Sequence, residues 1–399
     1  MTRRVVITGG GSIGPLGIGM EALVEGVVAG RTALERSGRT CAARVRQTAG
    51  PGPFHPNVWR RLDRCSRLAA TAAHEALDRA GPGAQSGGTV GLVTGTMTAG
   101  VASLGAFLTT LFEEGPGNVS PMLFPITVPN APASQCSLLL GLRGPSLTVS
   151  QMETSGLAAV ATAAGLVRDG VCDVALAGGA DECVPDFEDA WDRLHLLFRG
   201  DPEDFPGPFA RSRRGFVPGE GAFFVVLESR DGAARRGAGA WAEVLGESMT
   251  HTPGAAYRWP GDPGSAAAAI GSALAQARLR PEEIGCVVAG ANGSRVLDAL
   301  ETRAIRDALG PAARRIPVTS VKGGMGESGS ASACALLVAA CSIRRGFVPP
   351  VAGLVDPDPE LGLNVVVESA RREPLPSVLV NALGTGGSCA AVVLGRSGV

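Results

Sequence analysis

The segment spanning residues 144–170 combines a short apolar strand, a sharp polar corner and a helix, an arrangement in which enzymes present a nucleophile. Leu147 and Val149 belong to the predicted strand, and an alanine-rich helix runs from the corner to Asp169. Because this helix is small or apolar on nearly all faces, we expect it to be buried in a large protein. The residue at the corner is Glu153, which the helix N-terminus would place in a positive field. A cysteine there would ionise easily, but this chain has a carboxylate instead.

A second candidate for chemistry is Lys322, the only lysine among the 36 basic residues. In a chain so strongly biased towards arginine, we expect arginine wherever a generic surface cation suffices. The sequence therefore predicts a specific role for the Lys322 ammonium group.

Composition excludes several classes of function. The chain has 399 residues, is 45% hydrophobic and carries a net charge of −1, so it offers no basic surface for nucleic acid or an anionic membrane. Nine cysteines are scattered without a CxxC motif, and we expect neither a metal site nor a disulfide framework nor a cofactor. The N-terminal apolar run is too short for a signal peptide, and no apolar span is long enough to cross a membrane, so a cytoplasmic location is expected.

A glycine-rich phrase near the N-terminus, with Gly9, Gly11 and Gly14, satisfies the dinucleotide fingerprint GxGxxG and raises the alternative of a dehydrogenase. The acidic residue that should close a second strand about 20 residues later is missing. The only tyrosine, Tyr257, and Lys322 are too far apart in sequence to form the Tyr-x-x-x-Lys pair of short-chain reductases. We therefore predict that this phrase is a structural turn between a strand and a helix.

The two halves of the chain repeat each other in outline. The strand, corner and helix around Glu153 are matched near Glu327 by a second strand, a polar corner and an alanine-rich helix. Strands alternate with helices in both halves, which predicts an α/β fold of five layers, α/β/α/β/α. We expect the halves to be residues 1–240 and 241–399.

Ordered motifs along the whole chain resemble those of the β-ketoacyl synthases of the thiolase superfamily. The chain is similar to them in its opening, in a proline-containing loop, in the segment around Glu153, and in three later phrases. These stretches are RRVVITGGGSIGPLG, EEGPGNVSPMLFP, GLRGPS with TVSQMETSGLAAV, PFARSRRGFVPGEGAFFVVLE, SVKGGMGESGSA and NALGTGGSCAAVVL. The resemblance implies a duplicated thiolase fold.

The resemblance also implies that the catalytic residues of the family are largely replaced. The position of the acyl-carrying cysteine is Glu153, and the two histidine positions are Asn292 and Glu327. The lysine of the set remains as Lys322, and the phenylalanine gate corresponds to Thr385. An acyl anhydride on a glutamate would hydrolyse readily, so no catalytic residue for elongation is predicted. The four histidines lie outside these phrases and are expected at the surface or in structural positions: His55, His74, His195 and His251.

This combination of retained fold motifs and lost catalytic residues resembles the chain-length factor, or KS-beta subunit, of type II polyketide synthases. The resemblance implies a heterodimer with a catalytic ketosynthase, KS-alpha, with acyl carrier protein reached through that complex, and no nucleic acid or membrane partner. In aromatic-polyketide members the cysteine position is usually glutamine, so Glu153 favours a reducing or polyene-type pathway. The implied role is to shape a tunnel whose wall comes from residues 98–112, with Leu104, Phe107 and Leu108 as candidates. Ordinary core packing of these three is the alternative.

Two other activities remain open at this stage: a decarboxylase that supplies the primer from malonyl carrier protein through Glu153, and a catalytic β-ketoacyl synthase with displaced machinery. A further expectation concerns charge. The acidic residue that active members carry in the helix after the lysine corresponds to Leu336, yet a buried ammonium needs a carboxylate partner. We predict that Lys322 pairs with Glu153 or Glu327.

Overall fold

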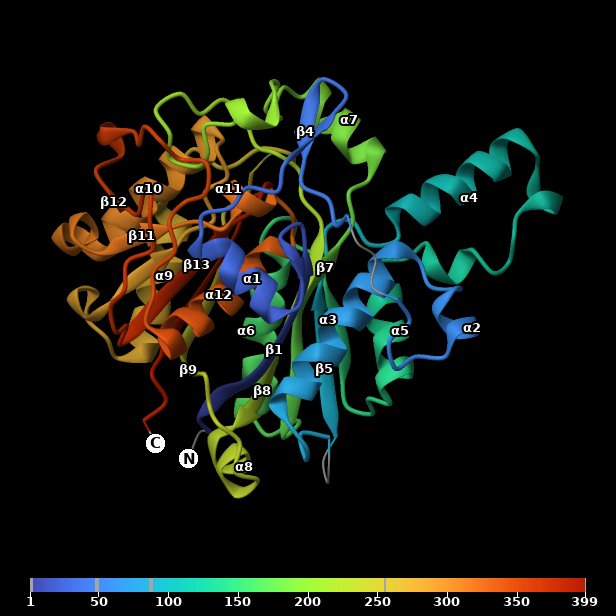
Figure 1. Cartoon of the computed structure of the whole chain (residues 1–399), viewed down its shortest axis with the longest axis horizontal. Coiled ribbons are helices and arrows are strands. Elements are labelled where there is room, and N and C mark those ends of the chain that lie inside the picture. Colours follow the sequence, from blue (N-terminus) through green and yellow to red (C-terminus); the bar gives the residue numbers. More distant parts are fainter. Residues whose placement is uncertain (1–2, 47–49, 86–88, 255, 399) are drawn as a thin grey trace.

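The computed structural model describes residues 3–46, 50–85, 89–254 and 256–398, and its strands form one large mixed sheet (Figure 1). In the first half of the chain the strand order is β1-β8-β7-β5-β6. In the second half it is β9-β14-β13-β10-β11. Strands that come at the same point in the sequence of each half therefore occupy the same place in each half of the sheet, which confirms the predicted duplication. These strands are β1 (Val5–Gly14), β5 (Val90–Gly95), β6 (Ser146–Val149), β7 (Val174–Asp181), β8 (Gly221–Ser229), β9 (Ala242–His251), β10 (Cys286–Val288), β11 (Pro317–Thr319), β13 (Ser377–Leu383) and β14 (Ser388–Gly395).

The two halves of the sheet meet where β1 pairs antiparallel with β9, with Val5 opposite Val244. Short strands complete the sheet: β2 (Gly17–Ile18) pairs with β1, and β12 (Asn364–Val365) pairs with β11. A separate hairpin is formed by β3 (Glu35–Ser37) and β4 (Thr40–Ala42). We propose the boundary between the halves at residues 240 and 241, just before β9 begins.

Helices lie in three layers around the two halves of the sheet. The helices α6 (Ser155–Arg168) and α12 (Ala331–Arg345) contact strands of both halves and each other, so they form the central layer. One outer layer contains α3 (Arg64–Ala80) and α5 (Ala131–Leu140), and the other contains α9 (Gly264–Ala277) and α10 (Arg295–Leu309). The architecture is therefore the predicted five-layered α/β/α/β/α thiolase fold. The remaining helices are α1 (Met20–Val28), α2 (Pro56–Trp59), α4 (Val101–Glu113), α7 (Pro185–Arg193), α8 (Arg230–Arg235) and α11 (Lys322–Met325).

The glycine-rich phrase lies inside strand β1, so the predicted strand-to-helix turn is wrong. Gly9 to Ile13 pair with β8, and α3 packs directly on this part of the strand. A Cβ atom on Gly9 would lie 2.3 Å from the carbonyl oxygen of Ala76, and one on Gly11 would lie 2.1 Å from that of Ala72. The glycines are needed for close helix-to-sheet packing, and no phosphate-binding loop is formed.

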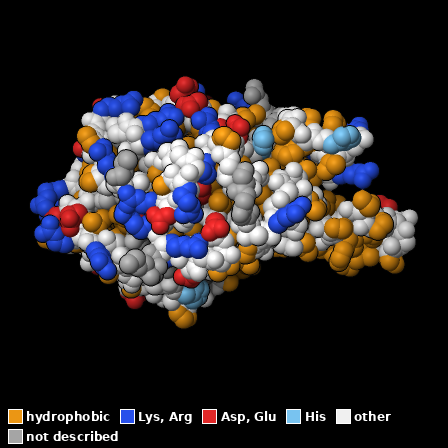
Figure 2. Space-filling view, turned by 90° about the horizontal axis from the view of Figure 1, so that it is seen from below, with side chains coloured by type: hydrophobic (Ala, Val, Ile, Leu, Met, Phe, Trp, Pro, Cys, Tyr) orange, Lys and Arg blue, Asp and Glu red, His pale blue; other side chains and the backbone are white. Residues whose placement is uncertain are grey.

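The segment from α4 to residue 128 projects from the body as an arm (Figure 1). None of the 13 residues of α4 is buried, although the helix is largely apolar. Phe107 lies against Phe124, with ring centroids 5.8 Å apart, and Leu104 is 39% exposed. Figure 2 shows hydrophobic side chains gathered on a projecting part of the molecule. Ordinary core packing, the alternative considered for Leu104, Phe107 and Leu108, is not observed within this chain.

Within the part of the chain that the structure describes, no helix combines the length and the apolarity needed to cross a membrane.

The packing of α3 on β1 predicts that Gly11→Ala destabilises the protein by about 3 kcal/mol or more, because the new methyl group meets backbone atoms that cannot move independently. The measurement is the urea midpoint of the purified chain. The matched control is Gly165→Ala in α6, where a Cβ meets nothing within 4 Å and alanine should stabilise the helix by about 0.5–1 kcal/mol. Equal stability of the two variants would contradict this account of the glycines.

Candidate functional site

The corner before α6 is held by its own side chains. Met152 adopts a left-handed conformation, with φ of 52°, which turns the chain sharply between β6 and α6. The Ser155 hydroxyl accepts from the Gln151 amide at 2.8 Å and donates to the Met152 carbonyl at 2.6 Å. Thr154 also donates to the Gln151 carbonyl at 2.8 Å. These hydrogen bonds within the first half of the chain define the turn of the backbone around Glu153.

The first amides of α6 are satisfied by the second half of the chain. Gly156 donates to the Gly329 carbonyl at 3.0 Å, and Leu157 donates to the Ser332 hydroxyl at 3.0 Å. The Glu153 carboxylate is directed elsewhere: its Oε2 atom accepts from the Thr385 amide at 2.8 Å. Glu153, although placed at the helix N-terminus as predicted, is thus held by the loop between β13 and β14.

Lys322 forms the predicted ion pair, and its partner is Glu327. The Lys322 Nζ atom lies 2.8 Å from Glu327 Oε2 and also donates to the Gly290 carbonyl at 2.8 Å. The Asn292 side-chain amide donates to the same Glu327 oxygen at 2.8 Å. The structure therefore brings Asn292, Lys322 and Glu327 into one hydrogen-bonded group, and Glu153 is bonded to Thr385 beside it.

Lys322 and the four residues at the replaced positions are all buried, so the charges of Glu153, Lys322 and Glu327 interact strongly. Burial raises the pKa of Glu153, although the Thr385 amide and the Lys322 ammonium oppose the shift. Burial raises the pKa of Glu327 to about 7, and the negative charge of Glu153 adds to the shift while Lys322 opposes it. This mutual effect shows that Glu153 lies within electrostatic reach of the ion pair. The site contains more carboxylate than ammonium groups.

Two further buried carboxylates on α10 belong to this group, and sequence reasoning missed them. Asp298 accepts from the amides of Asn292 at 3.0 Å and Phe209 at 2.8 Å. Glu301 accepts from the Gly290 amide at 2.7 Å, and burial raises its pKa to about 8. Burial likewise raises the pKa of Asp298 to about 6. A signal was present, because both acidic residues lie among the apolar positions of the buried face of α10.

Asp181 at the end of β7 also positions the site. Its Oδ1 atom accepts from the amides of Met97 at 2.7 Å and Thr98 at 2.8 Å, and its Oδ2 atom accepts from the Ser330 amide at 2.6 Å. One buried carboxylate thus ties the segment leading into the arm to the start of α12. The sequence around Asp181 has no hydrophobic periodicity that would indicate this role.

The four histidines lie outside the group, as expected. His55 caps α2, His74 packs edge-on against Phe54, and His195 and His251 are exposed. Among residues 3–46, 50–85, 89–254 and 256–398, no three histidine, cysteine or acidic side chains lie together in an arrangement that could hold a metal ion.

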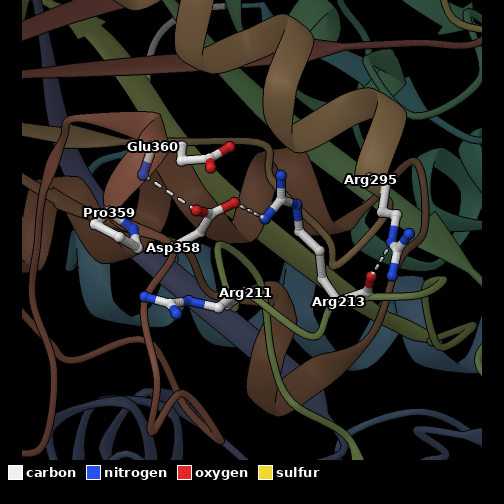
Figure 3. Close-up of a pocket in the computed structure, with 6 residues that line it drawn as sticks. All are labelled: Arg211, Arg213, Arg295, Asp358, Pro359 and Glu360. Atoms are coloured by element: carbon white, nitrogen blue, oxygen red, sulfur yellow. Dashed lines mark hydrogen bonds and ion pairs between the residues drawn. The ribbon is translucent and has the colours of Figure 1, made fainter.

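A pocket of about 400 Å³ opens near Asp298 and is lined by charged side chains (Figure 3). Arg213 donates to Asp358 at 2.6 Å and lies 3.9 Å from Asp298, while Arg295 donates to the Arg213 carbonyl at 2.8 Å. The guanidinium groups of Arg213 and Arg295 are therefore bonded to other groups of the same chain. Neither Lys322 nor any of the four replaced catalytic positions lines this pocket.

The comparisons with known proteins agree with this geometry. The model of the β-ketoacyl synthase N-terminal domain matches residues 2–233, and that of the β-ketoacyl synthase C-terminal domain matches residues 241–355. The chain belongs to the β-ketoacyl synthase family. It is 34% identical to the tetracenomycin polyketide synthase ketoacyl synthase alpha subunit of Streptomyces glaucescens, over 99% of this chain and 97% of that protein.

Solved structures of the family have the same fold. The ishigamide ketosynthase/chain length factor superposes with a TM-score of 0.90 at 28% identity, covering 100% of both chains. A β-ketoacyl synthase from Burkholderia phymatum superposes with a TM-score of 0.92 at 27% identity, covering 99% of this chain and 100% of that one. The likeness thus extends over both halves of the chain.

The arrangement at the replaced positions lacks the groups that acyl transfer uses. Neither a thiol nor an imidazole is present among Glu153, Asn292, Lys322, Glu327 and Thr385. The cysteine next to the Thr385 loop, Cys389, has its pKa raised to about 11 by burial, so it is a thiol at neutral pH and a poor nucleophile. The side chains at these positions accommodate buried charge in the Lys322–Glu327 pair, and the hydrogen bond of Glu153 with Thr385 links the two halves of the fold.

The ion pair predicts that Lys322→Met destabilises the protein by about 3–5 kcal/mol, because it leaves the Glu327 carboxylate buried without its ammonium partner. Adding Glu327→Gln to this variant should recover part of the loss, since the stranded charge is then removed. Chemical denaturation measures both changes.

The control is Arg193→Met, which breaks the exposed pair of Arg193 with Asp189 and should cost less than about 1 kcal/mol. A Lys322→Met variant as stable as this control would show that the buried pair is not required.

Proposed function

We propose that the chain is a non-elongating chain-length factor, a KS-beta subunit that pairs with a catalytic KS-alpha in a type II polyketide synthase. The observation that carries the proposal is the replacement of the cysteine and both histidines of the acyl-transfer set, which leaves a buried group in which the retained Lys322 pairs with Glu327 and Glu153 is held by Thr385. The sequence relative compared above is named as a ketoacyl synthase alpha subunit, and one solved structure is named as a ketosynthase/chain length factor, so the non-elongating role is inferred from the residues of the site. The departure from glutamine at position 153 favours a reducing or polyene-type pathway.

The arm and the neighbouring sheet edge provide a surface that fits a partner of the same fold. The strand β6 lies at the end of the sheet order, so among the described residues no further strand pairs with its outer edge. Leu147 on β6 is 41% exposed, Leu138 on α5 is 77% exposed and Phe112 on α4 is 79% exposed. Large apolar side chains exposed on contacting elements, as on α5 and β6, are typical of obligate interfaces. KS-alpha is the partner proposed here, and acyl carrier protein would act through the complex.

The partial exposure of Leu104, Phe107 and Leu108 supports their assignment to the tunnel wall. A wall at a subunit interface is completed by the partner, so its residues should be only partly covered in the isolated chain. The Phe107 ring packs against Phe124 within the arm, with ring centroids 5.8 Å apart. These side chains would then limit the length of the growing polyketide by their bulk.

Heterodimer formation predicts low solubility of the chain expressed alone and a stable 1:1 complex on coexpression with KS-alpha, with an interface above roughly 2,000 Å² in total. Size-exclusion chromatography with light scattering measures the assembly. Leu147→Asp should weaken the complex, because it places an unpaired charge in the interface. Purification of a well-behaved wild-type monomer would contradict the prediction.

Length control predicts that Leu104→Ala, Phe107→Ala or Leu108→Ala lengthens the polyketide made by the reconstituted complex, because a smaller side chain moves the end of the tunnel. Mass spectrometry of the products is the measurement. Thr109→Ala, at an exposed position of the same helix, is the matched control and should leave the length unchanged. Unchanged products from all three wall variants would remove α4 from this role.

The same assay separates the chain-length factor from the alternative of a primer-supplying decarboxylase. Under the proposed function Glu153→Gln retains product formation from malonyl carrier protein alone, since Glu153 takes part in no chemical step. Loss of initiation that supplied acetyl primer restores would instead support the decarboxylase.

A further inference from the structure

The Asp181 carboxylate at the end of β7 holds the root of the arm (residues 96–100). Its Oδ1 atom accepts from the Thr96 hydroxyl at 3.0 Å and from the amides of Met97 at 2.7 Å and Thr98 at 2.8 Å. Its Oδ2 atom accepts from the Ser330 amide at the start of α12, at 2.6 Å. Asp181 is fully buried, and burial raises its pKa while these backbone amides oppose the shift. Four donors from two distant segments therefore converge on one side chain.

The Thr98 side chain fixes the root a second time. Its hydroxyl donates to the Glu182 carbonyl at 2.8 Å and accepts from the Glu182 amide at 3.1 Å. The Thr96 hydroxyl accepts from the Ala99 amide at 3.0 Å, and both threonines are buried. Because each of these polar groups would be costly to leave unpaired in the interior, the root has one preferred conformation.

Both ends of the arm meet at this root. Gly100 adopts a left-handed conformation, with φ of 80°, and a Cβ atom there would lie 2.8 Å from the carbonyl carbon of Thr127. The chain therefore leaves the body and returns to it at one point, and none of the 13 residues of α4 in between is buried (Figure 1). Since α4 buries no side chain of its own, the position of the arm relative to the body is set by its root.

The same carboxylate connects the root to the buried ion pair. Ser330 lies three residues after Glu327, on the segment that leads from that pair into α12. A Cβ atom on Gly329 would lie 3.1 Å from Asp181 Oδ2 and 2.9 Å from the Met152 carbonyl oxygen, so glycine is needed for this approach. The root, the start of α12 and the corner before α6 are therefore packed together around the Asp181 side chain.

We propose that Asp181 is a positioning residue for length control, because by joining the root to the start of α12 it holds the arm in one place. The inference rests on the proposed function, since it takes α4 as part of the tunnel wall. Asp181 and the wall side chains then have different effects on the product. The bulk of a wall side chain sets the mean length, whereas the carboxylate narrows the range of lengths, because a wall held by a fixed support ends the tunnel at one point.

The test is Asp181→Asn in the full-length chain reconstituted with KS-alpha. The asparagine oxygen can still accept from the root, but its amide nitrogen then faces the Ser330 amide, so two donors oppose each other and the link to α12 is lost. The share of the principal product should fall about twofold or more, with shorter and longer polyketides appearing, because the arm then samples several positions. Mass spectrometry of the products measures this distribution.

The matched control is Glu228→Gln, which changes a second buried carboxylate at the other end of the same strand pair. Asp181 lies opposite Gly221 in the pairing of β7 with β8, and Glu228 lies opposite Val174. Glu228 Oε2 accepts from Arg236 at 2.8 Å, so this variant also loses a buried charge, but away from the root. It should be destabilised and keep the wild-type product distribution. Equal broadening in both variants would overturn the proposal, since loss of stability alone would then explain it.

Hydrogen exchange in the purified complex tests the link directly. The Ser330 amide should exchange slowly in the wild type, and about tenfold faster or more in Asp181→Asn than in Glu228→Gln, because only the former loses its acceptor. Exchange of the wild-type Ser330 and Thr98 amides at the rate of exposed loop amides would overturn the proposal even if Asp181→Asn did not fold.

The products also separate this inference from the function on which it rests. A longer product from Leu104→Ala together with an unchanged distribution in Asp181→Asn would overturn the inference and leave the chain-length factor in place. Unchanged products from both variants would remove α4 from length control, and the positioning role of Asp181 with it.

Discussion

Close packing of α6 against α12 is the constraint on which the site depends. A Cβ atom on Gly156 would lie 2.8 Å from the Cβ atom of Ala333, so the helices meet at a point where one of them can carry no side chain. This contact fixes the N-termini of both helices next to each other, and the Gly156 amide reaches across to the Gly329 carbonyl at 3.0 Å. Because the corner with Glu153 precedes one helix and Glu327 precedes the other, the packing itself places the two carboxylates near one another.

Once these carboxylates are buried together, the free energy of their desolvation has to be offset within the chain. The Lys322 ammonium and the Asn292 side-chain amide supply this compensation to Glu327, each at 2.8 Å, and the Thr385 backbone amide supplies it to Glu153 at 2.8 Å. An ion pair with these additional hydrogen bonds holds the geometry, whereas loss of one partner would leave a charge without compensation. The polar centre of the protein is therefore maintained by electrostatic balance and does not require catalysis.

Much of this arrangement could be predicted from the sequence, and the exceptions have physical causes. The five-layered fold and the buried helices followed from the alternation of strands and helices together with the resemblance to the β-ketoacyl synthases. The pair of Lys322 with a nearby carboxylate followed from the rarity of lysine and from that same resemblance. The glycine phrase at Gly9 and Gly11 was misassigned because close packing and a tight turn both require glycine, and only the position of α3 distinguishes them. The exposure of α4 could not be predicted either, because an interface helix and a core helix have the same apolar composition.

The choice of residue at position 153 follows from the donors that surround it. The Thr385 amide is buried and points at this position, so it must have an acceptor whether or not the site performs chemistry. In the role proposed above the chain carries no acyl group, so the Glu153 side chain supplies the oxygen that this amide needs. Glutamate and glutamine reach that distance from the backbone, and both are acceptors. This requirement explains how a glutamate can stand here where the aromatic-polyketide members that the sequence resembles have glutamine: the fold demands an oxygen, and the neighbouring Lys322 makes a charged one tolerable.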